Sequence, residues 1–193
     1  LYLGGEDVNS GIKERLESLG ADLSKIALVD KHIDCTTSEF TNLIKDIRPA
    51  LVIIDPLVSF VGGDVNINSQ VGARQVADHL RDVAREHKTS ITMVVHPPKR
   101  GDYKLLYRFS GSGAFVDATR TATYIGYHPT EPNKRVGIQP KNNIKNTAPY
   151  TYILDEKLGY MWTGEDSSIK RKDVEAANAY EAESEGSQLE YYE

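Results

Sequence analysis

Cysteine is almost absent from this chain, because Cys35 is the only one in 193 residues. A single cysteine excludes an internal disulfide framework and is typical of proteins in a reducing cytoplasm. Long apolar runs are also lacking, since none approaches the roughly 20 residues that a membrane-spanning helix needs. The amino terminus, LYLGGEDVNSG, has neither the basic start nor the apolar stretch of a signal peptide. We therefore expect a cytoplasmic protein with no membrane partner.

An excess of positive charge is missing too, since the formal net charge is -5. The acidity is concentrated in residues 165–193, where nine acids and three bases give a net charge of -6. The other residues hold nineteen acids and twenty bases, a net charge of +1, so the overall charge neither supports nor excludes nucleic-acid binding. We predict a folded core over residues 1–164 and an acidic linker or tail over residues 165–193, partly helical or disordered.

Short apolar runs alternate with helical patterns in the first half of the chain, which predicts βαβ units and a mainly parallel sheet. The run Leu51–Ile54 is typical of a strand that is buried on both faces. Thr36 and Glu39 have the spacing of a capping box at a helix start. The predicted strands are Leu1–Leu3, Ile26–Val29, Leu51–Ile54 and Ile91–Val95, and the predicted helices are Ser10–Leu19, Thr36–Ile47 and Gln70–His87.

The second half of the chain has short strand-like runs separated by turn residues. This pattern predicts antiparallel hairpins added to the edge of the sheet. The runs are Thr121–Ile125, Arg135–Gln139, Tyr150–Leu154 and Tyr160–Trp162.

Polar side chains end three of the predicted parallel strands. Glu6 follows the first strand, Asp55 ends the Leu51 strand and His96 follows the Ile91 strand. Because the carboxyl ends of parallel strands meet at one edge of a sheet, these three residues could converge on a bound phosphate. Their types suit a base for water, a metal holder and a phosphate sensor. A strand-end cap for Asp55 and a hydrogen-bonded, partly buried side chain for His96 are the structural alternatives.

The segments GGED, LVIIDPLVSFVGGDVN, VVHPPK, YRFSGSGAFVDATR and KNN occur in this order. Together they resemble the RecA-like ATPase domains of plasmid- and phage-type replicative DNA helicases, over about residues 1–162. The resemblance implies an α/β fold, a RecA-like P-loop NTPase core whose mainly parallel twisted sheet is flanked by helices and followed by C-terminal antiparallel hairpins. It also implies an ATP hydrolase that uses Mg²⁺, forms a homo-oligomeric ring, a hexamer, and acts on single-stranded DNA.

The resemblance also assigns roles to single residues. Glu6 would activate water, Asp55 would hold Mg²⁺ through water and His96 would sense the terminal phosphate. Arg120 would act as a finger into the nucleotide site of the neighbouring subunit, and Lys141 would contact the nucleotide there. For Arg120 and Lys141 the alternative is an ordinary surface or salt-bridged cation.

A basic loop follows His96. It carries Lys99, Arg100, Lys104 and Arg108, with two tyrosines among them. Cations interleaved with aromatic rings could form a phosphate-and-stacking surface for single-stranded DNA. A basic loop that is simply solvated remains the alternative.

One motif of that family is lacking, because no G-x-x-x-x-G-K-[ST] segment occurs in the chain. The chain also has no initiator methionine, so we expect Leu1 to lie a few tens of residues into the domain, with the phosphate-binding loop upstream. We expect these 193 residues alone to hydrolyse ATP negligibly. Two other functions stay open: a RecA-like regulatory, loader or recombination ATPase without unwinding activity, and a catalytically inactive binding scaffold.

Overall fold

The computed structural model describes residues 1–5, 9–29, 31–96, 114–155 and 159–178. These residues form two compact units, which are described separately below. The first unit contains Leu1–His96 together with the short helix α4 (Ala114–Ala118), and the second contains the described residues from Thr119 onward. Within the described residues, no helix is long and apolar enough to cross a membrane.

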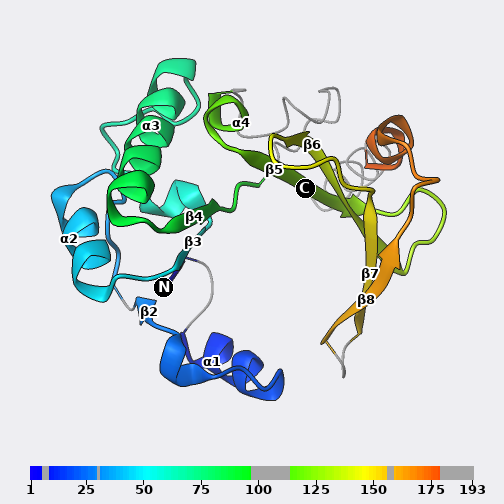
Figure 1. The fold of residues 1–193 in the computed structure, drawn as a ribbon, viewed down its shortest axis with the longest axis horizontal. Helices are drawn as coiled ribbons and strands as arrows, with labels where there is room; N and C mark the ends of the chain where they lie inside the picture. Colours follow the sequence, from blue (N-terminus) through cyan, green and yellow to red (C-terminus); the bar gives the residue numbers. More distant parts are fainter. Residues whose placement is uncertain (6–8, 30, 97–113, 156–158, 179–193) are drawn as a thin grey trace, which may run out of the picture. The chain divides into compact units, whose positions relative to one another are not determined.

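The first unit, hereafter the parallel unit, is built on a sheet whose strand order is β2-β1-β3-β4 (Figure 1). All three strand pairings are parallel, as the alternating sequence pattern predicted. The strands are β1 (Tyr2–Gly4), β2 (Leu28–Val29), β3 (Leu51–Asp55) and β4 (Ser90–Met93). The helical segments besides α4 are α1 (Asn9–Ser18), η1 (Leu23–Lys25), α2 (Ser38–Ile47), η2 (Leu57–Phe60) and α3 (Gln70–His87).

Helices α2 and α3 pack on one face of this sheet and contribute to its core. Phe40 of α2 and Val76 of α3 are buried in the same cluster as Val52 and Ile54 of β3. Leu51, by contrast, is 45% exposed, and Ile53 is half-buried. The prediction that this strand is buried on both faces was therefore wrong, because side chains alternate across a strand and only one set meets α2 and α3.

The starts of α2 and α3 show how far local sequence predicts where a helix begins. The bounds of α3 are those that the apolar stripe predicted, and the Ser69 hydroxyl caps it by accepting from the Gly72 amide at 3.0 Å. The predicted capping box of α2 was wrong, because Thr37 rather than Thr36 is its N-cap. The Thr36 hydroxyl donates instead to Asp34 at 2.7 Å, and Glu39 pairs with Lys31.

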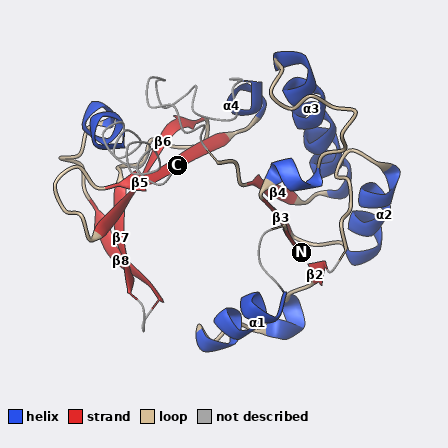
Figure 2. Cartoon of the chain, turned by 180° about the vertical axis from the view of Figure 1, so that it is seen from behind, coloured by secondary structure: helices blue, strands red, loops and turns tan. Residues whose placement is uncertain are grey.

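The second unit, hereafter the antiparallel unit, has a sheet of its own, with strand order β5-β6-β7-β8 (Figure 2). Its strands are β5 (Thr121–Tyr127), β6 (Lys134–Asn142), β7 (Tyr150–Asp155) and β8 (Gly159–Glu165). The predicted hairpins are confirmed, since all three pairings are antiparallel. Their predicted place at the edge of the parallel sheet was wrong for the described residues, because β5 to β8 pair only with one another there.

A helix over residues 171–178 packs on one face of the antiparallel sheet. Val174 on this helix is fully buried in a cluster with Val136 and Ile138 of β6. Asn178 holds the helix to β5: its carboxamide oxygen accepts from the Tyr127 amide at 2.8 Å, and its nitrogen donates to the Tyr127 carbonyl at 3.2 Å. This part of the acidic segment therefore packs on the sheet, while the predicted domain boundary after residue 164 stays a prediction.

Candidate functional site

Asp55 lies at the carboxyl end of β3, in the middle of the parallel sheet. It pairs in register with Gly4 at the end of β1, and its carbonyl accepts from the Gly5 amide at 2.7 Å. Its side chain is half-buried, and one carboxylate oxygen accepts from the Tyr2 hydroxyl at 3.1 Å. Asp55 thus stands at the sheet edge where open α/β folds bind ligands.

Tyr2 is the residue at this site that the sequence did not point to. Tyr2 and Gly4 lie on the same face of β1, and a β-carbon on Gly4 would come within 2.6 Å of the Tyr2 ring. Glycine at this position therefore lets the ring lie along the strand and reach Asp55 on the neighbouring strand. The only signal for Tyr2 was the period-two alternation of β1, which predicts its face and not its partner.

His96 follows the next strand of the same sheet. The chain continues beside β3 beyond the end of β4, since the Val94 amide donates to the Ile54 carbonyl at 2.9 Å and the Val94 carbonyl accepts from the Leu57 amide at 2.8 Å. His96 lies two residues further on, with an exposed side chain. The ends of β1, β3 and β4 are therefore neighbours at one edge of the sheet, as the parallel pattern predicted.

Five of the predicted site residues lie outside the described part of the chain. Glu6 is one of them, although Gly5 immediately before it is hydrogen-bonded to Asp55. The others are the candidate DNA contacts Lys99, Arg100, Lys104 and Arg108. Their predicted roles remain predictions.

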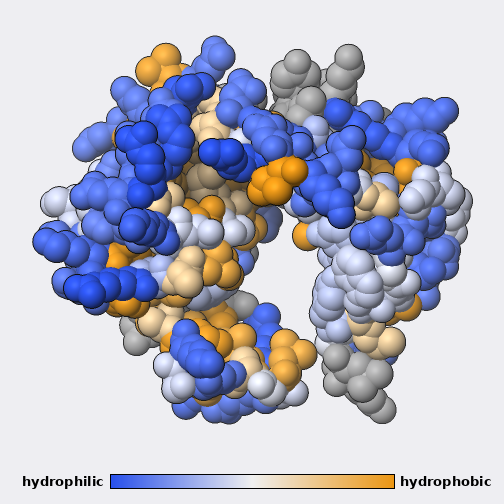
Figure 3. Space-filling model, in the orientation of Figure 1, coloured by the Kyte–Doolittle hydropathy of each residue, from blue (hydrophilic) through white to orange (hydrophobic). Residues whose placement is uncertain are grey.

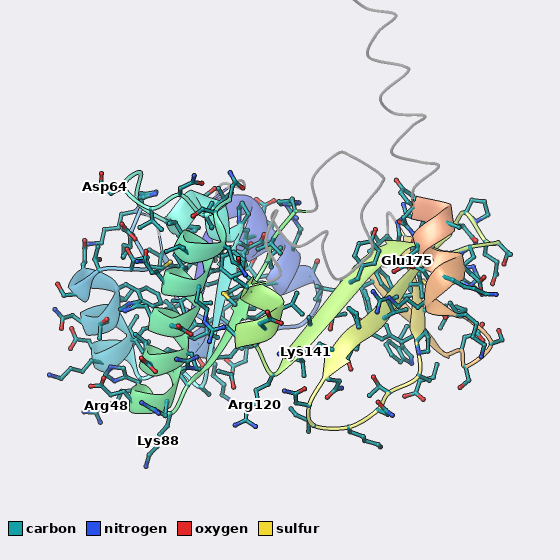
Figure 4. All side chains as sticks on the ribbon, turned by 90° about the horizontal axis from the view of Figure 1, so that it is seen from above. Arg48, Asp64, Lys88, Arg120, Lys141 and Glu175 are labelled. Carbon is teal, nitrogen blue, oxygen red and sulfur yellow. The ribbon has the colours of Figure 1, made fainter. Side chains whose placement is uncertain are left out.

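The two candidate finger residues come together in the antiparallel unit (Figure 4). Lys141 of β6 pairs in register with Ala122 of β5, and the Arg120 carbonyl accepts from the Asn143 amide at 3.0 Å. Arg120 is exposed and Lys141 is half-buried. Two cations that are 21 positions apart in sequence thus lie at the same end of the β5–β6 ladder.

The described residues contain no group of three or more His, Cys, Asp or Glu side chains that could hold a metal ion. A magnesium site does not require such a group, because Mg²⁺ is usually held by one or two carboxylates together with water and substrate phosphates. The Asp55 carboxylate at the sheet edge fits that kind of site. Tyr2 binds one of its oxygens and would orient the carboxylate toward the ion, as hydrogen-bonding partners of metal ligands do.

Comparison with solved structures shows which fold this arrangement represents. A solved ATPase domain matches with a TM-score of 0.67 and 14% identity, over 85% of this chain and 74% of that chain. The RadB recombinase matches with a TM-score of 0.54 and 13% identity, over 82% of this chain and 76% of that chain. A comparison with curated protein sequences found no match.

The parallel sheet with its flanking helices, followed by an antiparallel sheet, is thus the α/β fold of the RecA-like ATPase domains. This agrees with the predicted fold class. The family follows from the sequence itself, since residues 1–102 match the model of the AAA_25 family, described as an AAA domain. Because that match spans more than half of the 193 residues, the chain belongs to the AAA_25 family.

Proposed function

We propose that this domain is the ATP-hydrolysing motor of a DNA helicase-like protein that works as a hexameric ring on single-stranded DNA. The observation that carries the proposal is the position of Asp55, at the carboxyl end of the central strand β3 between the ends of β1 and β4. In nucleotide hydrolases a carboxylate at this position holds the magnesium ion that accompanies the nucleotide phosphates. The family match and the likeness to a solved ATPase domain support the same class of activity.

ATP would be the substrate of this motor and Mg²⁺ its metal ion. The ion would neutralise charge on the transferred phosphate. Asp55 would hold it, through water, with Tyr2 fixing the orientation of the carboxylate. Glu6 would take a proton from the attacking water, and His96 would contact the terminal phosphate.

Arg120 and Lys141 would serve the nucleotide site of a neighbouring subunit. Their common position at one end of the β5–β6 ladder supports a joint role, because two cations there can approach one anionic group together. A cation that reaches the phosphate from another subunit stabilises charge in the transition state and links hydrolysis to assembly. Removing Arg120 would therefore lower turnover in the assembled protein.

The proposal is tested by Asp55→Asn in the natural full-length protein, with Asp64→Asn as the matched control. Asp64 is an exposed aspartate in the loop before α3 (Figure 4), so the same chemical change there leaves the sheet edge intact. We expect Asp55→Asn to lower magnesium-dependent ATP turnover about 10- to 100-fold, as loss of an indirect metal partner does. Equal turnover in both variants contradicts the proposed role of Asp55.

ATP turnover measured with and without single-stranded DNA distinguishes the motor from the alternative functions. Strong stimulation of turnover by DNA supports a translocating motor. Turnover without stimulation supports a regulatory, loader or recombination ATPase, a class that the likeness to the RadB recombinase also favours. No turnover at all supports a binding scaffold. Because the 193 residues contain no phosphate-binding loop motif, we expect them alone to hydrolyse ATP negligibly, and magnesium-dependent hydrolysis by this chain alone that Glu6→Gln abolishes would contradict that expectation.

A further inference from the structure

One face of the antiparallel sheet carries a row of side chains that crosses all four strands, with aromatic rings on β5, β7 and β8 and an arginine on β6. Tyr127 of β5 pairs with Arg135 of β6, Arg135 pairs with Tyr152 of β7, and Tyr152 pairs with Trp162 of β8. Residues directly opposite each other on neighbouring strands share a face. Two more tyrosines, each two positions away along β7 or β8, point to the same side. We call these six residues the aromatic face: Tyr127, Arg135, Tyr150, Tyr152, Tyr160 and Trp162.

The side chains of the aromatic face contact one another in pairs. The Arg135 guanidinium lies 4.1 Å from the centroid of the Tyr127 ring. The rings of Tyr152 and Tyr160 are 4.6 Å apart between centroids, and those of Tyr150 and Trp162 are stacked at 5.1 Å. These contacts hold the rings in place and so lower the entropy lost when a ligand stacks on them.

A glycine in β6 makes room for one of these rings. A β-carbon on Gly137 would overlap the ring of Tyr150, which pairs with Gly137 in register. The ring therefore extends across the neighbouring strand. Glycine in a strand interior weakens the strand, so its presence here marks a close approach that the ring requires.

The two faces of the sheet differ in burial at β8, although Tyr152 in the middle of the aromatic face is only 7% exposed. Val136 and Ile138 on the opposite face are buried against the helix over residues 171–178. On the aromatic face, Trp162 is 56% exposed and Tyr160 is 48% exposed. Figure 3 shows the pale surface of intermediate hydropathy that lies over β7 and β8. Large aromatic side chains exposed together mark an interaction surface.

Charge distinguishes the partners that such a surface would fit. Residues 119–155 hold five lysines and arginines and two acids, a net charge of +3, whereas the whole chain has a net charge of -5. Cations beside exposed rings suit single-stranded nucleic acid, whose phosphates are anionic and whose bases have flat faces. Of these cations, Arg135 is the one that lies on the aromatic face, beside the Tyr127 ring; an apolar protein partner would use the rings alone, whereas single-stranded nucleic acid would also use the Arg135 guanidinium.

We propose that the aromatic face binds single-stranded nucleic acid, with bases stacked on Trp162 and Tyr160 and with phosphates near Arg135. The choice of partner rests on the proposed function, while the site is separate from the sheet edge at Asp55. Trp162 is the only tryptophan of the chain, so its emission reports directly on stacking. Binding to the aromatic face requires neither ATP nor turnover.

The test is binding of a fluorescently labelled oligothymidylate to the chain without nucleotide. Trp162→Ala is expected to weaken binding about 5- to 100-fold, the range for loss of one base–aromatic stack. Trp162→Phe should restore most of the affinity, because phenylalanine keeps a flat ring. Met161→Ala is the matched control, since Met161 is the neighbouring residue on the other face of β8 and should leave binding unchanged.

A second measurement covers the case in which Trp162→Ala does not fold. Unlabelled oligothymidylate is expected to quench Trp162 emission in the unmodified chain, and Arg135→Gln should lower the salt dependence of binding by about one phosphate contact. The proposal is overturned if oligothymidylate does not bind or does not quench Trp162 emission, or if Trp162→Ala and Met161→Ala bind it with equal affinity. It is also overturned if the chain self-associates and only Trp162→Ala disrupts that association, because the aromatic face would then bind a second copy of the chain. If DNA stimulates ATP turnover while the aromatic-face variants bind normally, the proposed function stands and this inference fails.

Discussion

The parallel and the antiparallel unit bury their side chains in different ways. In the described residues, the main core of the parallel unit has seventeen buried residues, nearly all aliphatic or phenylalanine, whereas the core cluster of the antiparallel unit has five. The antiparallel unit adds directional contacts. These are the two hydrogen bonds between Asn178 and Tyr127 of β5, hereafter the Asn178 clasp, and the paired rings of the aromatic face. Packing volume should therefore control stability in the first unit, and hydrogen bonds and ring chemistry should matter more in the second.

The largest expected effect is loss of packing in the parallel unit. Phe40 is fully buried between α2 and the sheet, so Phe40→Ala should cost about 3–5 kcal/mol of unfolding free energy. Amide hydrogen exchange should speed up in β3 and α2, while β6 keeps its protection because Phe40 is not part of its core. Ile47→Ala, at an exposed position of the same helix, should change stability by less than about 0.5 kcal/mol. Equal loss of protection in β3 and β6 would show that the units unfold as one.

How far the sequence predicts each unit follows from the range of the contacts involved. The bounds of α3 were predictable, because an apolar stripe and a capping serine are local features. The start of α2 was not, because Asp34 and Lys31 bind the two residues of the expected capping box. The sequence could not predict that β5 to β8 form a sheet of their own, because a strand-like run does not specify which other strand it pairs with.

The candidate site also has features that local sequence predicts and features that depend on long-range contacts. The edge at which Asp55 stands follows from parallel pairing, which the alternating pattern of the chain predicts. The Tyr2 contact joins residues that are 53 positions apart, and the aromatic row depends on three registers at once. Neither feature could be predicted from local sequence. The catalytic roles of Glu6, Asp55, His96, Arg120 and Lys141 stay predictions.

A medium effect is expected from the hydrogen-bonded clasp of the antiparallel unit. Asn178→Ala removes partners from both the amide and the carbonyl of Tyr127, and such groups cost about 1–3 kcal/mol when they are left unsatisfied. Denaturant unfolding followed by Trp162 emission should therefore shift to lower denaturant concentration. Asn133→Ala, at an exposed position in the β5–β6 turn, should leave the midpoint unchanged. A midpoint shared by both variants would mean that the clasp contributes nothing to stability.

The smallest effect is a different alkaline sensitivity of the two units. Burial, with a smaller contribution from Asp34, raises the pKa of the Cys35 thiol to about 12 from its ordinary value of 9.0. The folded parallel unit therefore keeps a proton that the unfolded chain releases between about pH 9 and pH 12. This contribution to stability is complete below pH 9 and is lost as pH rises through that window, at most about 1.4 kcal/mol per pH unit. Cys35→Ala should flatten this alkaline slope in the exchange of β3.

In the antiparallel unit the corresponding loss should begin later, because tyrosines rather than a thiol release the protons. Burial, and after it the neighbouring phenols, raise the pKa values of Tyr150 and Tyr152 above the ordinary value of 10.0. Their neutral forms are favoured in the folded state, so stability should fall only above about pH 10. The denaturant midpoint read by Trp162 emission should then decline in the unmodified chain and stay level in the double variant Tyr150→Phe and Tyr152→Phe. Since Trp162 stacks on Tyr150, the midpoint and not the emission intensity decides the outcome. A decline of equal steepness in the double variant would place the alkaline sensitivity outside the aromatic face.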